Sequence, residues 1–345
     1  MRWNLFLLFL LLGPGVFAQP VQKEEVPVLR SNARQFLQSG DYANAIMVYN
    51  QLIALEPSNL THRRQLAQVY FLQGNLKNAE KTVSPLLKEK NADAETFQVA
   101  CLIFSAMKRY DEAKDVIHKG LQKFPGAGML YKEKADLLLA QEKYSEATEA
   151  LEKGVEHDPS FPQNYYNLSK MYFYSRNYLR AIYTGEIFLN LEPFTARSEE
   201  MKKNIFESYK LLIASLNELA LNGKADQYEN PKNFEQAVLQ SFMNVRNTVS
   251  GGVHVSSLTM LRIRFLLYWN KMFARIYPCE LFDQQQRLLL NGCFEAYNQW
   301  CFGRSDQEKQ YIDWARENST TMNRFDTWFR SHPLSIPQGQ FYFTK

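Results

Sequence analysis

The chain lacks the short motifs that mark most catalytic and metal sites. Its four cysteines form no Cys-x-x-Cys pair, so a metal or redox site of that kind has little support. Its five histidines are scattered, and no paired-histidine zinc motif, nucleophile elbow or phosphate-binding glycine loop is present. We therefore predict a protein that is not an enzyme, with no catalytic residue, no metal site and no cofactor.

Two further patterns are missing, and each excludes a class of protein. The formal net charge is +4 and the isoelectric point about 8.7, a basic balance too weak to indicate nucleic acid as a partner. No alternating apolar pattern is long enough for a β-sheet. The sequence therefore favours an all-α fold without a nucleic-acid partner.

The apolar run at the start of the chain is short. It extends from Leu5 to Leu12, follows Arg2, and is too short to span a bilayer comfortably. A helix-breaking Gly-Pro-Gly follows, and Val16-Phe17-Ala18 then offers a small-residue cleavage site, as in a secretory signal. We expect a signal peptide at residues 1–18, cleaved after Ala18, with a membrane anchor as the alternative.

The predicted cleavage places the mature chain outside the cytoplasm. No cysteine follows the cleavage point, which argues against a bacterial lipoprotein, and the short signal ending in Ala18-Gln19 is similar to a bacterial export signal. We therefore expect a periplasmic or extracellular protein. Residues 19–25 form a polar lead-in.

What the chain has instead is one pattern that recurs at a fixed step of 34 residues. Alanine occupies the same place in each unit, at Ala45, Ala79, Ala113, Ala147 and Ala181. Twelve residues later each unit ends, at Pro57, Asn91, Pro125, Pro159 and Pro193, where proline cannot continue a helix. A turn is expected eight residues before each alanine, at Gly40, Gly74, Lys108, Glu142 and Arg176. This period suits a helix–turn–helix pair.

Each first helix carries a small residue where it would cross its partner, at Ala33, Ala67, Cys101, Ala135 and Ser169. In these features the chain resembles the tetratricopeptide repeat family, in five copies at residues 26–59, 60–93, 94–127, 128–161 and 162–195. The tryptophan of the family's first helix is replaced by Leu29, Arg63, Phe97, Tyr131 and Tyr165, but the register holds throughout. The resemblance implies a right-handed superhelix of stacked repeats, whose first helices line a concave groove.

The resemblance also implies which side chains face that groove, at the fifth, ninth and twelfth positions of the repeats. They are Arg30, Arg34, Arg64, Gln68, Phe71, Gln98, Lys132, Asp136, Tyr166, Lys170 and Phe173. The first two repeats are basic, so Arg30, Arg34 and Arg64 could hold a carboxylate or an acidic peptide. The alternative is a solvated basic face without a specific ligand. These residues do not reproduce the lysine–asparagine set with which some family members clamp a C-terminal carboxylate.

The repeat pattern stops after Pro193. An apolar stripe within residues 196–223 predicts a helix that begins at Ser198 and covers the open face of the last repeat. Residues 224–345 predict a further helical domain, which we match to no family. Its helices are expected from Asn230-Pro231 to about Ser250, from Ser256 or Ser257 to Pro278, from Glu280 toward Gly303, and from a Ser305/Glu308 capping box to about Ser331.

Two features of this second half leave alternatives open. The basic amphipathic stretch 257–277 could lie on an anionic membrane, but we favour a core helix whose arginines snorkel. Cys279, Cys293 and Cys301 could include a disulfide if the chain breaks at Asn291-Gly292, but we favour buried free thiols.

Two groups of side chains in the same half could carry chemistry. A catalytic group of His254, Cys293 and Asp306 rests on residue type alone. A sugar-stacking platform is an alternative for aromatic residues that we expect in a helical core, namely Tyr297, Trp300, Phe302, Trp314, Trp328 and Phe329.

Together these patterns predict a non-catalytic protein–protein interaction scaffold of the bacterial cell envelope. It would hold a peptide or protein segment, acidic in character, in the groove of the repeats. The alternative is a glycan-binding protein or an enzyme with its site in residues 224–345, and a concave pocket with convergent polar groups there would favour it. Self-association through the ends of the solenoid is a third possibility, and the sequence leaves the oligomeric state open.

Overall fold

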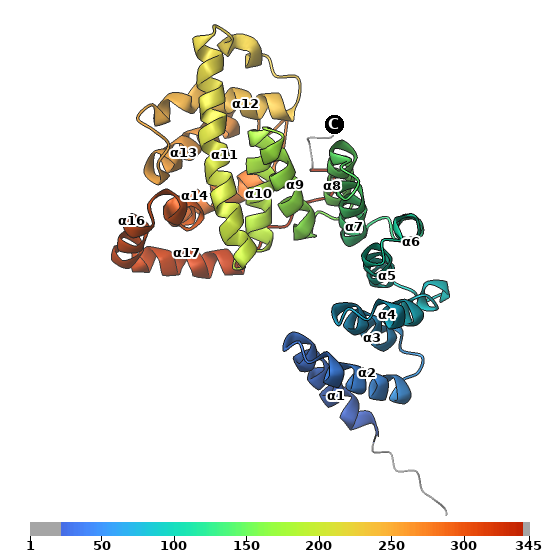
Figure 1. Ribbon diagram of the computed structural model, residues 1–345. Coiled ribbons are helices and arrows are strands. Elements are labelled where there is room, and N and C mark those ends of the chain that lie inside the picture. The colour runs from blue at the N-terminus through green and yellow to red at the C-terminus, as the bar shows by residue number, and fades with distance from the viewer. Residues whose placement is uncertain (1–21, 341–345) are drawn as a thin grey trace, which may run out of the picture. The chain divides into compact units, whose positions relative to one another are not determined.

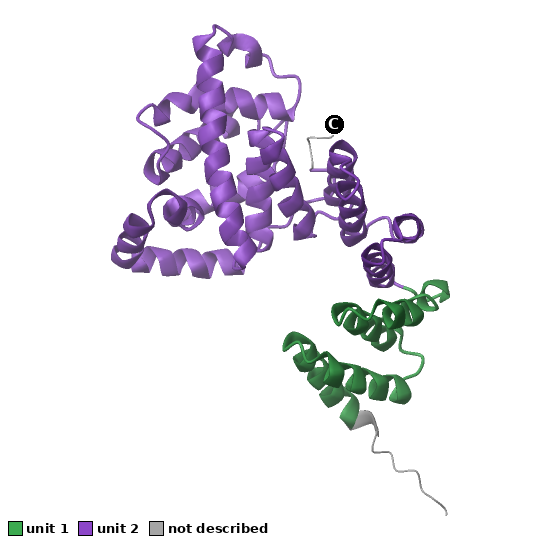
Figure 2. Ribbon diagram, in the orientation of Figure 1, with its two compact units in different colours: residues 1–92 green, residues 93–345 purple. Residues whose placement is uncertain are grey.

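The computed structural model describes residues 22–340, so the predicted signal peptide lies outside the described residues. Between these limits the chain forms helices and no strand, which confirms the all-α prediction. The chain divides into two compact units, residues 1–92 and 93–345 (Figure 2). The division falls between the second and third repeats, whereas the sequence analysis groups all five repeats together. The units are therefore described one at a time.

Unit 1 contains the first two repeats as two pairs of helices and a short 3-10 turn (Figure 1). They are α1 (Gln22–Gln38), α2 (Tyr42–Leu55), α3 (Leu60–Leu72), α4 (Leu76–Val83) and η1 (Leu86–Lys88). The side chains of Asp41 and Asn75 cap the two second helices by accepting hydrogen bonds from backbone N–H groups. Ala33, Ala45 and Leu52 are fully buried in the core between the helices.

Unit 2 begins with the other three repeats, again as pairs of helices (Figure 1). They are α5 (Ala94–Ala106), α6 (Tyr110–Lys123), α7 (Gly128–Leu139), α8 (Tyr144–His157), α9 (Pro162–Tyr174) and α10 (Tyr178–Leu191). Each first helix packs against the second helix of its own repeat. Successive repeats also stack within this unit, since α7 contacts α5 and α9.

The turn inside each repeat adopts the same backbone conformation, whatever residue occupies it. Gly40 and Gly74 have φ values of 75° and 81°. The corresponding residues of the later repeats are not glycine, yet Lys108, Glu142 and Arg176 have φ values of 59°, 60° and 64°. This left-handed region is unfavourable for a side chain with a Cβ atom. The expected turns are therefore confirmed, and three of them carry backbone strain.

The recurring small residues lie where helices approach one another most closely. All five alanines of the second helices have no exposed surface, and Ala33, Ala67, Ala135 and Ser169 are equally buried in the first helices. Cys101 takes the same place in the third repeat with 1% of its surface exposed. Packing alone therefore explains why small residues recur at these positions.

The remainder of unit 2 is a set of helices of very different lengths. They are α11 (Ala196–Leu221), η2 (Ala225–Tyr228), α12 (Phe234–Val245), η3 (Arg246–Val249), α13 (Val255–Met272), α14 (Glu280–Leu290), α15 (Phe294–Asn298), the π-helix η4 (Gln299–Gly303), α16 (Arg304–Glu317) and α17 (Ser319–Ser331). The long helix α11 packs on α10, as expected for a helix that covers the last repeat. A π-helix is rare and often marks a functional site.

Several expected helix ends are wrong. Helix α11 is capped by Thr195, and Ser198 is instead its third residue, whose hydroxyl accepts from the Thr195 backbone N–H. Helix α12 begins at Phe234, after the cap Asn233, because the Asn233 side chain accepts the hydrogen bond that Asn230 was expected to accept. Helix α13 begins at Val255 and stops at Met272, before Pro278 is reached.

The last two expected helices are each divided in two. The stretch from Glu280 breaks at Gly292, whose φ of 64° turns the chain before α15 begins. The Ser305/Glu308 capping box does not form, because Ser305 already lies in α16, which follows the π-helix without a gap and is interrupted at Gln307. The chain breaks again at Asn318, between α16 and α17. Glycine and asparagine at these breaks are typical helix-ending residues.

Helix α10 is the centre of unit 2. Every residue from 181 to 190 is buried, which is unusual for the second helix of a repeat. Helices α9 and α11 cover it along the repeat axis, and side chains of α13 and α14 contact it from the other direction. The last repeat and the C-terminal helices therefore share one hydrophobic core.

None of the helices in residues 22–340 is both long and apolar enough to cross a membrane.

Candidate functional site

In unit 1, the first and third helices border a hollow of about 270 Å³. We call it the basic hollow. Its lining residues are Arg30, Arg34, Tyr49, Asn59, Thr61, His62 and Gln65. Two of the predicted groove residues, Arg30 and Arg34, are thus brought together, with Gln65 beside them.

The two arginines of the basic hollow differ in their partners. Arg30 donates from Nη2 to Oε2 of Glu56 at 2.8 Å, and the same carboxylate binds His62 and Asn59. Hydrogen bonds from His62, Asn59 and Arg30, in that order, lower the pKa of Glu56 to about 2. Arg34 has no hydrogen-bond or ion-pair partner among the side chains described, so its guanidinium is available to an acidic group.

The other predicted groove residues of unit 1 lie outside this hollow. Arg64 is buried, with 5% of its surface exposed, so it cannot act as the solvent-facing cation that was expected. Gln68 and Phe71 are half-buried and do not line the basic hollow. The basic character of this face therefore comes from α1 more than from α3.

In unit 2, the predicted groove residues of the third and fourth repeats form one polar network. Gln98 donates from Nε2 to Oε1 of Glu133 at 3.0 Å, and Nζ of Lys132 contacts the same oxygen at 3.2 Å. Lys132 also pairs with Asp136 at 2.8 Å. Glu133 has only 3% of its side chain exposed, and this burial raises the pKa of its carboxyl group. The sequence analysis did not include Glu133, although it adjoins the predicted Lys132.

A larger hollow of about 1040 Å³ lies between the fourth and fifth repeats. We call it the repeat hollow, and its lining includes Asp136, Leu139, Tyr144, Thr148, Glu152, Tyr166, Lys170, Met171, Tyr174 and Arg180. Three of these, Asp136, Tyr166 and Lys170, are predicted groove residues. Two tyrosines that the sequence analysis did not assign to the groove are exposed in its wall, since Tyr144 is 62% and Tyr174 77% exposed.

The cation of the fifth repeat is already paired with the covering helix. Glu200 of α11 accepts from Oη of Tyr166 at 2.5 Å and from Nζ of Lys170 at 2.7 Å. The hydrogen bond from Lys170 is the main reason that the pKa of Glu200 is lowered. Phe173 lies against the rings of Tyr174 and Tyr178 instead of lining the hollow. This part of the site is therefore held in one arrangement by contacts within the chain.

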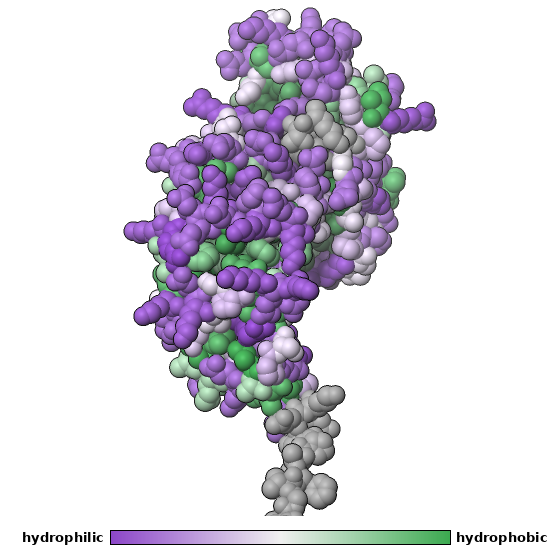
Figure 3. Space-filling model, turned by 90° about the vertical axis from the view of Figure 1, so that its right-hand side faces the viewer, coloured by the Kyte–Doolittle hydropathy of each residue, from purple (hydrophilic) through white to green (hydrophobic). Residues whose placement is uncertain are grey.

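Polar side chains also fix the opposite wall of the repeat hollow. Arg180 donates from Nη2 to Glu235 at 2.8 Å and lies 3.5 Å from Glu152, which accepts from the hydroxyl of Tyr172. The wall is thus tied to α12 as well as to α8 and α9. The surface around the repeats is mostly hydrophilic, and apolar side chains show only in the gaps between polar ones on the face in Figure 3.

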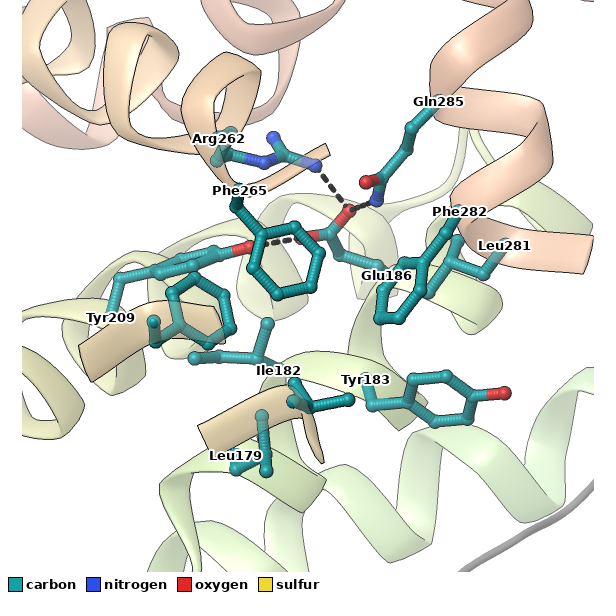
Figure 4. A pocket seen from close by; sticks show the side chains of 12 residues that line it. Leu179, Ile182, Tyr183, Glu186, Tyr209, Arg262, Phe265, Leu281, Phe282 and Gln285 are labelled. Atoms are coloured by element: carbon teal, nitrogen blue, oxygen red, sulfur yellow. Dashed lines mark hydrogen bonds and ion pairs between the residues drawn. The ribbon is translucent and has the colours of Figure 1, made fainter. Parts of the chain in front are cut away.

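Deeper in unit 2 is an ion pair that solvent does not reach (Figure 4). Glu186 of α10 binds Arg262 of α13 at 2.5 Å, and their side chains are 1% and 2% exposed. Tyr209 donates to the other carboxylate oxygen at 2.8 Å, and Gln285 donates at 2.7 Å to the oxygen that Arg262 contacts. Asn298 accepts from the second terminal nitrogen of Arg262 at 2.5 Å. This enclosed polar cluster links α10, α11, α13, α14 and α15, and a ligand cannot enter it.

This cluster decides between the two interpretations of residues 257–277. Leu258, Leu261, Phe265 and Trp269 are buried, so the favoured core helix is confirmed. Its arginines do not all snorkel, however, because Arg262 points into the core and pairs with Glu186. In the sequence, this buried ion pair could have been inferred from Glu186, a single acidic residue within the otherwise apolar second half of α10.

In the C-terminal half, a polar hollow of about 310 Å³ lies among the start of α13, the π-helix and α16. We call it the π-helix hollow, and its polar lining includes His254, Ser256, Gln299, Asp306, Gln307 and Gln310. Nδ1 of His254 lies 3.5 Å from Oδ1 of Asp306, so two members of the imagined catalytic group do meet. Cys293 does not line this hollow and is fully buried, so the three residues do not form a site.

The remaining aromatic and sulfur side chains mostly belong to the core. Tyr297, Trp300, Phe302 and Phe329 are buried, as the helical-core interpretation predicted, while Trp314 and Trp328 are half-buried. All four cysteines are buried and unpaired. In the part of the chain that the structure describes, no group of three or more histidine, cysteine or acidic residues is arranged to hold a metal ion.

Comparison with known proteins gives a family for the repeats. A family model described as tetratricopeptide repeat matches residues 36–98 and 105–171. The human protein O-mannosyl-transferase TMTC1 is 30% identical over 128 residues, which are 35% of this chain and 14% of that protein. The chain thus spans far less than two thirds of this curated relative.

Two solved structures of similar proteins are also named tetratricopeptide repeat proteins. A thermophilic tetratricopeptide repeat protein from Thermus thermophilus aligns with a TM-score of 0.45 and 13% identity, over 53% of this chain and 98% of that one. A tetratricopeptide repeat protein from Parabacteroides merdae aligns with a TM-score of 0.39 and 14% identity, over 78% of this chain and 100% of that one.

The geometry of the repeats and the family model agree. Each of the five helix pairs turns through a left-handed residue at the same place, and each second helix buries an alanine at the same place. The matched segments cover most of this region. The repeat region that contains residues 36–98 and 105–171 is therefore built of tetratricopeptide repeats.

Proposed function

We propose that this protein is a non-catalytic interaction scaffold of the bacterial cell envelope, and that it holds a peptide or protein segment against its repeats. The general role is supported by the repeats themselves, because proteins of this kind use stacked helix pairs as extended surfaces for protein and peptide partners. The location outside the cytoplasm rests only on the sequence of residues 1–18.

The repeat hollow is the observation that carries the proposal. It measures about 1040 Å³, at the upper end of the range of small-molecule pockets, which is about 300–1,000 Å³. Tyr144 and Tyr174 expose most of their surface there, and Met171 and Leu139 add apolar atoms. Tyrosine contributes strongly to binding when a partner covers it, because its ring is large and its hydroxyl can still form a hydrogen bond. A segment with apolar side chains suits this surface.

The wall of the repeat hollow is also held in place before any partner arrives. Glu200 fixes Tyr166 and Lys170, and Glu235 fixes Arg180. Side chains that are already ordered lose little conformational entropy when they bind. A small number of contacts could then give useful affinity.

In unit 1, the basic hollow supports the acidic character of the partner. Arg34 lines it without a described partner of its own, and a guanidinium binds a carboxylate through two parallel hydrogen bonds. We propose that an acidic side chain, or a chain terminus, binds there. Because Arg64 is buried, the charge-reversal test of this hollow is Arg34→Glu and not a change of Arg64.

Photo-cross-linking tests the proposal in cells that make the protein. A photoreactive phenylalanine analogue at position 174 should capture a defined partner, because this side chain faces the repeat hollow. The control is position 110, because Tyr110 is 42% exposed outside the hollow and is the counterpart, one repeat earlier, of Tyr144, the other exposed tyrosine of the hollow. Capture of the same protein from both positions, or from neither, would contradict the proposal.

The compartment needs a separate experiment. The proposal expects mature chain that begins at Gln19 in the periplasmic or extracellular fraction, which N-terminal sequencing of the purified protein measures. Full-length chain in the cytoplasm would contradict it.

A further inference from the structure

The π-helix hollow is separate from the repeats and has no part in the function proposed above. It lies where the start of α13, the π-helix and α16 meet. Two irregularities shape it. The π-helix widens the backbone between Gln299 and Gly303, and Gln307 interrupts α16 with an extended conformation of φ −147° and ψ 98°. A π-helix is rare and is often found at functional sites.

Gln299 indicates that a ligand belongs in this hollow. It lines the hollow with only 8% of its surface exposed, and its side-chain amide has no hydrogen-bond partner within residues 22–340. Its amide atoms are not among the fully enclosed ones, so they face the hollow, where a ligand could become their hydrogen-bond partner. Its oxygen lies against Gly303, where an added Cβ would approach it to 2.5 Å. Glycine at this position therefore lets the amide occupy its place in the wall.

The acidic group of the hollow is already engaged on both sides. Oδ2 of Asp306 accepts from the backbone N–H of Val255 at 2.8 Å, and Oδ1 lies 3.5 Å from Nδ1 of His254. No lysine or arginine appears in the lining that the structure describes. A phosphate or carboxylate would thus find no permanent cation here, while a neutral ligand could bind the free faces of these groups.

Two aromatic side chains complete the wall. Trp314 is half-buried and its ring makes no contact with another aromatic ring or with a cation in the described chain. Tyr311 is packed more tightly, since Gly303 lies against its ring and Arg304 lies over it. One aromatic ring with a free surface, surrounded by amide and hydroxyl groups, suits a ligand that has both apolar C–H groups and hydroxyl groups.

We propose that the π-helix hollow binds one ring of a neutral sugar. Hydroxyl groups of the sugar would pair with Gln299, Gln307 and Gln310, and its C–H groups would lie against Trp314. The volume of about 310 Å³ suits a single ring rather than a longer chain. Asp306 is the only carboxylate in the lining described, whereas glycoside hydrolysis usually needs a pair of carboxylates, so the site binds sugar without cleaving it.

Titration of the purified full chain with simple sugars tests this inference. The probes are glucose, galactose, mannose and N-acetylglucosamine, with chitotriose to distinguish a free ring from the end of a longer glycan. Binding is measured by saturation-transfer NMR and by calorimetry. At least one of these sugars should bind saturably, and chitotriose should bind through a single terminal ring.

Four variants locate the binding. Trp314→Ala and Gln299→Met should each weaken it about tenfold, the effect of losing one well-formed contact. Because Gln299 is buried, Gln310→Ala provides a second test on an exposed side chain that cannot fail through misfolding. Trp328→Ala is the matched control, since Trp328 stacks on His332 outside the hollow, and it should leave affinity within about twofold.

Three results would overturn the inference. One is the absence of saturable binding by the unmodified protein to any of the probes. Another is an affinity that neither Trp314→Ala nor Gln310→Ala changes, although thermal unfolding shows both variants folded. The third is an equal loss in Trp328→Ala, which would mean that sugar binds elsewhere. Success or failure here is independent of the cross-linking experiment at the repeat hollow.

Discussion

Nη2 of Arg262 lies 2.5 Å from the carboxylate of Glu186, and both side chains are within the core of unit 2. Glu186 belongs to the last repeat and Arg262 to a helix almost eighty residues further along the chain. Their pairing explains why repeats three to five and the C-terminal helices form one compact unit. A buried charge requires its partner, because removing one member while the other stays buried leaves an uncompensated charge in the core.

Breaking this pair should strongly destabilise unit 2. Arg262→Met leaves the Glu186 carboxylate buried without its cation, and we expect the free energy of unfolding to fall by about 3–5 kcal/mol. Urea unfolding followed by circular dichroism measures this loss.

Removing both charges should do less harm than removing one. The double variant Glu186→Leu/Arg262→Met replaces the pair by apolar side chains, which is often neutral or stabilising. It should therefore be more stable than Arg262→Met alone. A double variant that is less stable than the single one would contradict the role given to the pair.

The three strained turns of unit 2 predict stabilising substitutions. Lys108, Glu142 and Arg176 hold left-handed backbone that glycine adopts without strain, so each change to glycine should raise stability by about 0.5–1 kcal/mol. The gain in stability is smaller than the strain energy that is relieved, because glycine also raises the conformational entropy of the unfolded chain. Thermal unfolding measures it.

The control for these turns is a glycine inside a helix. Lys119 is exposed in the middle of α6, and Lys119→Gly should lower stability by about 1 kcal/mol. If the turn variants lost stability as Lys119→Gly does, the strain at these positions would be refuted.

Glu56 predicts a pH dependence of unit 1. Hydrogen bonds from His62, Asn59 and Arg30 lower its pKa from 4.5 to about 2 in the folded chain. A lowered carboxyl pKa means that the folded state gains stability above the ordinary value and loses it as the pH falls through the window between 4.5 and 2. Glu56→Gln should remove this contribution.

Amide hydrogen exchange of residues 22–92 is the appropriate measurement, because it reports on unit 1 alone. The difference in protection between the original chain and Glu56→Gln should be largest at neutral pH and should shrink as the pH falls below 4.5. A difference that stays constant with pH would show that Glu56 does not titrate in this way.

The cysteines should be unreactive until the chain unfolds. Burial raises the pKa of the Cys101, Cys279 and Cys301 thiols to about 12, and burial also raises the pKa of Cys293. Because the thiolate is the reactive form, a thiol reagent should react slowly with the native protein. In denaturant without reductant, all four thiols should titrate. Fewer than four would indicate a disulfide and would contradict the free thiols of the structure.

The repeats were predictable because their information is local and repeated. The turn at Lys108 and the alanine at Ala113 each recur in five copies, so the register could be fixed without any knowledge of distant contacts. Buried alanines and left-handed turns then followed from helix packing and backbone sterics.

The C-terminal helix ends were harder to predict because tertiary contacts override local signals. Ser305 and Glu308 have the spacing of a capping box, but Ser305 already lies in α16, which follows the π-helix without a gap and is interrupted at Gln307 instead. Asn230-Pro231 is a reasonable helix start, yet Asn233 provides the cap one turn later. No local rule distinguishes these cases.

The candidate sites were predictable only in part. Positions in the repeat gave Arg30, Arg34, Asp136, Tyr166 and Lys170, which line hollows in the structure. They could not reveal that Arg64 is buried. The contact between His254 and Asp306 joins positions more than fifty residues apart. Residue type suggested that His254 and Asp306 could act together, but only the fold shows that Cys293 lies apart from them.

Calorimetry with the partner captured at position 174, in purified form, tests the role of the repeat hollow most directly. The double variant Tyr144→Ala/Tyr174→Ala should weaken binding about 30-fold or more, because two exposed aromatic contacts are lost together. Tyr110→Ala, at the equivalent of position 144 one repeat earlier, should stay within about twofold of the original affinity. If the double variant binds as tightly as the unmodified chain, the partner does not lie in the repeat hollow and the proposed function is wrong.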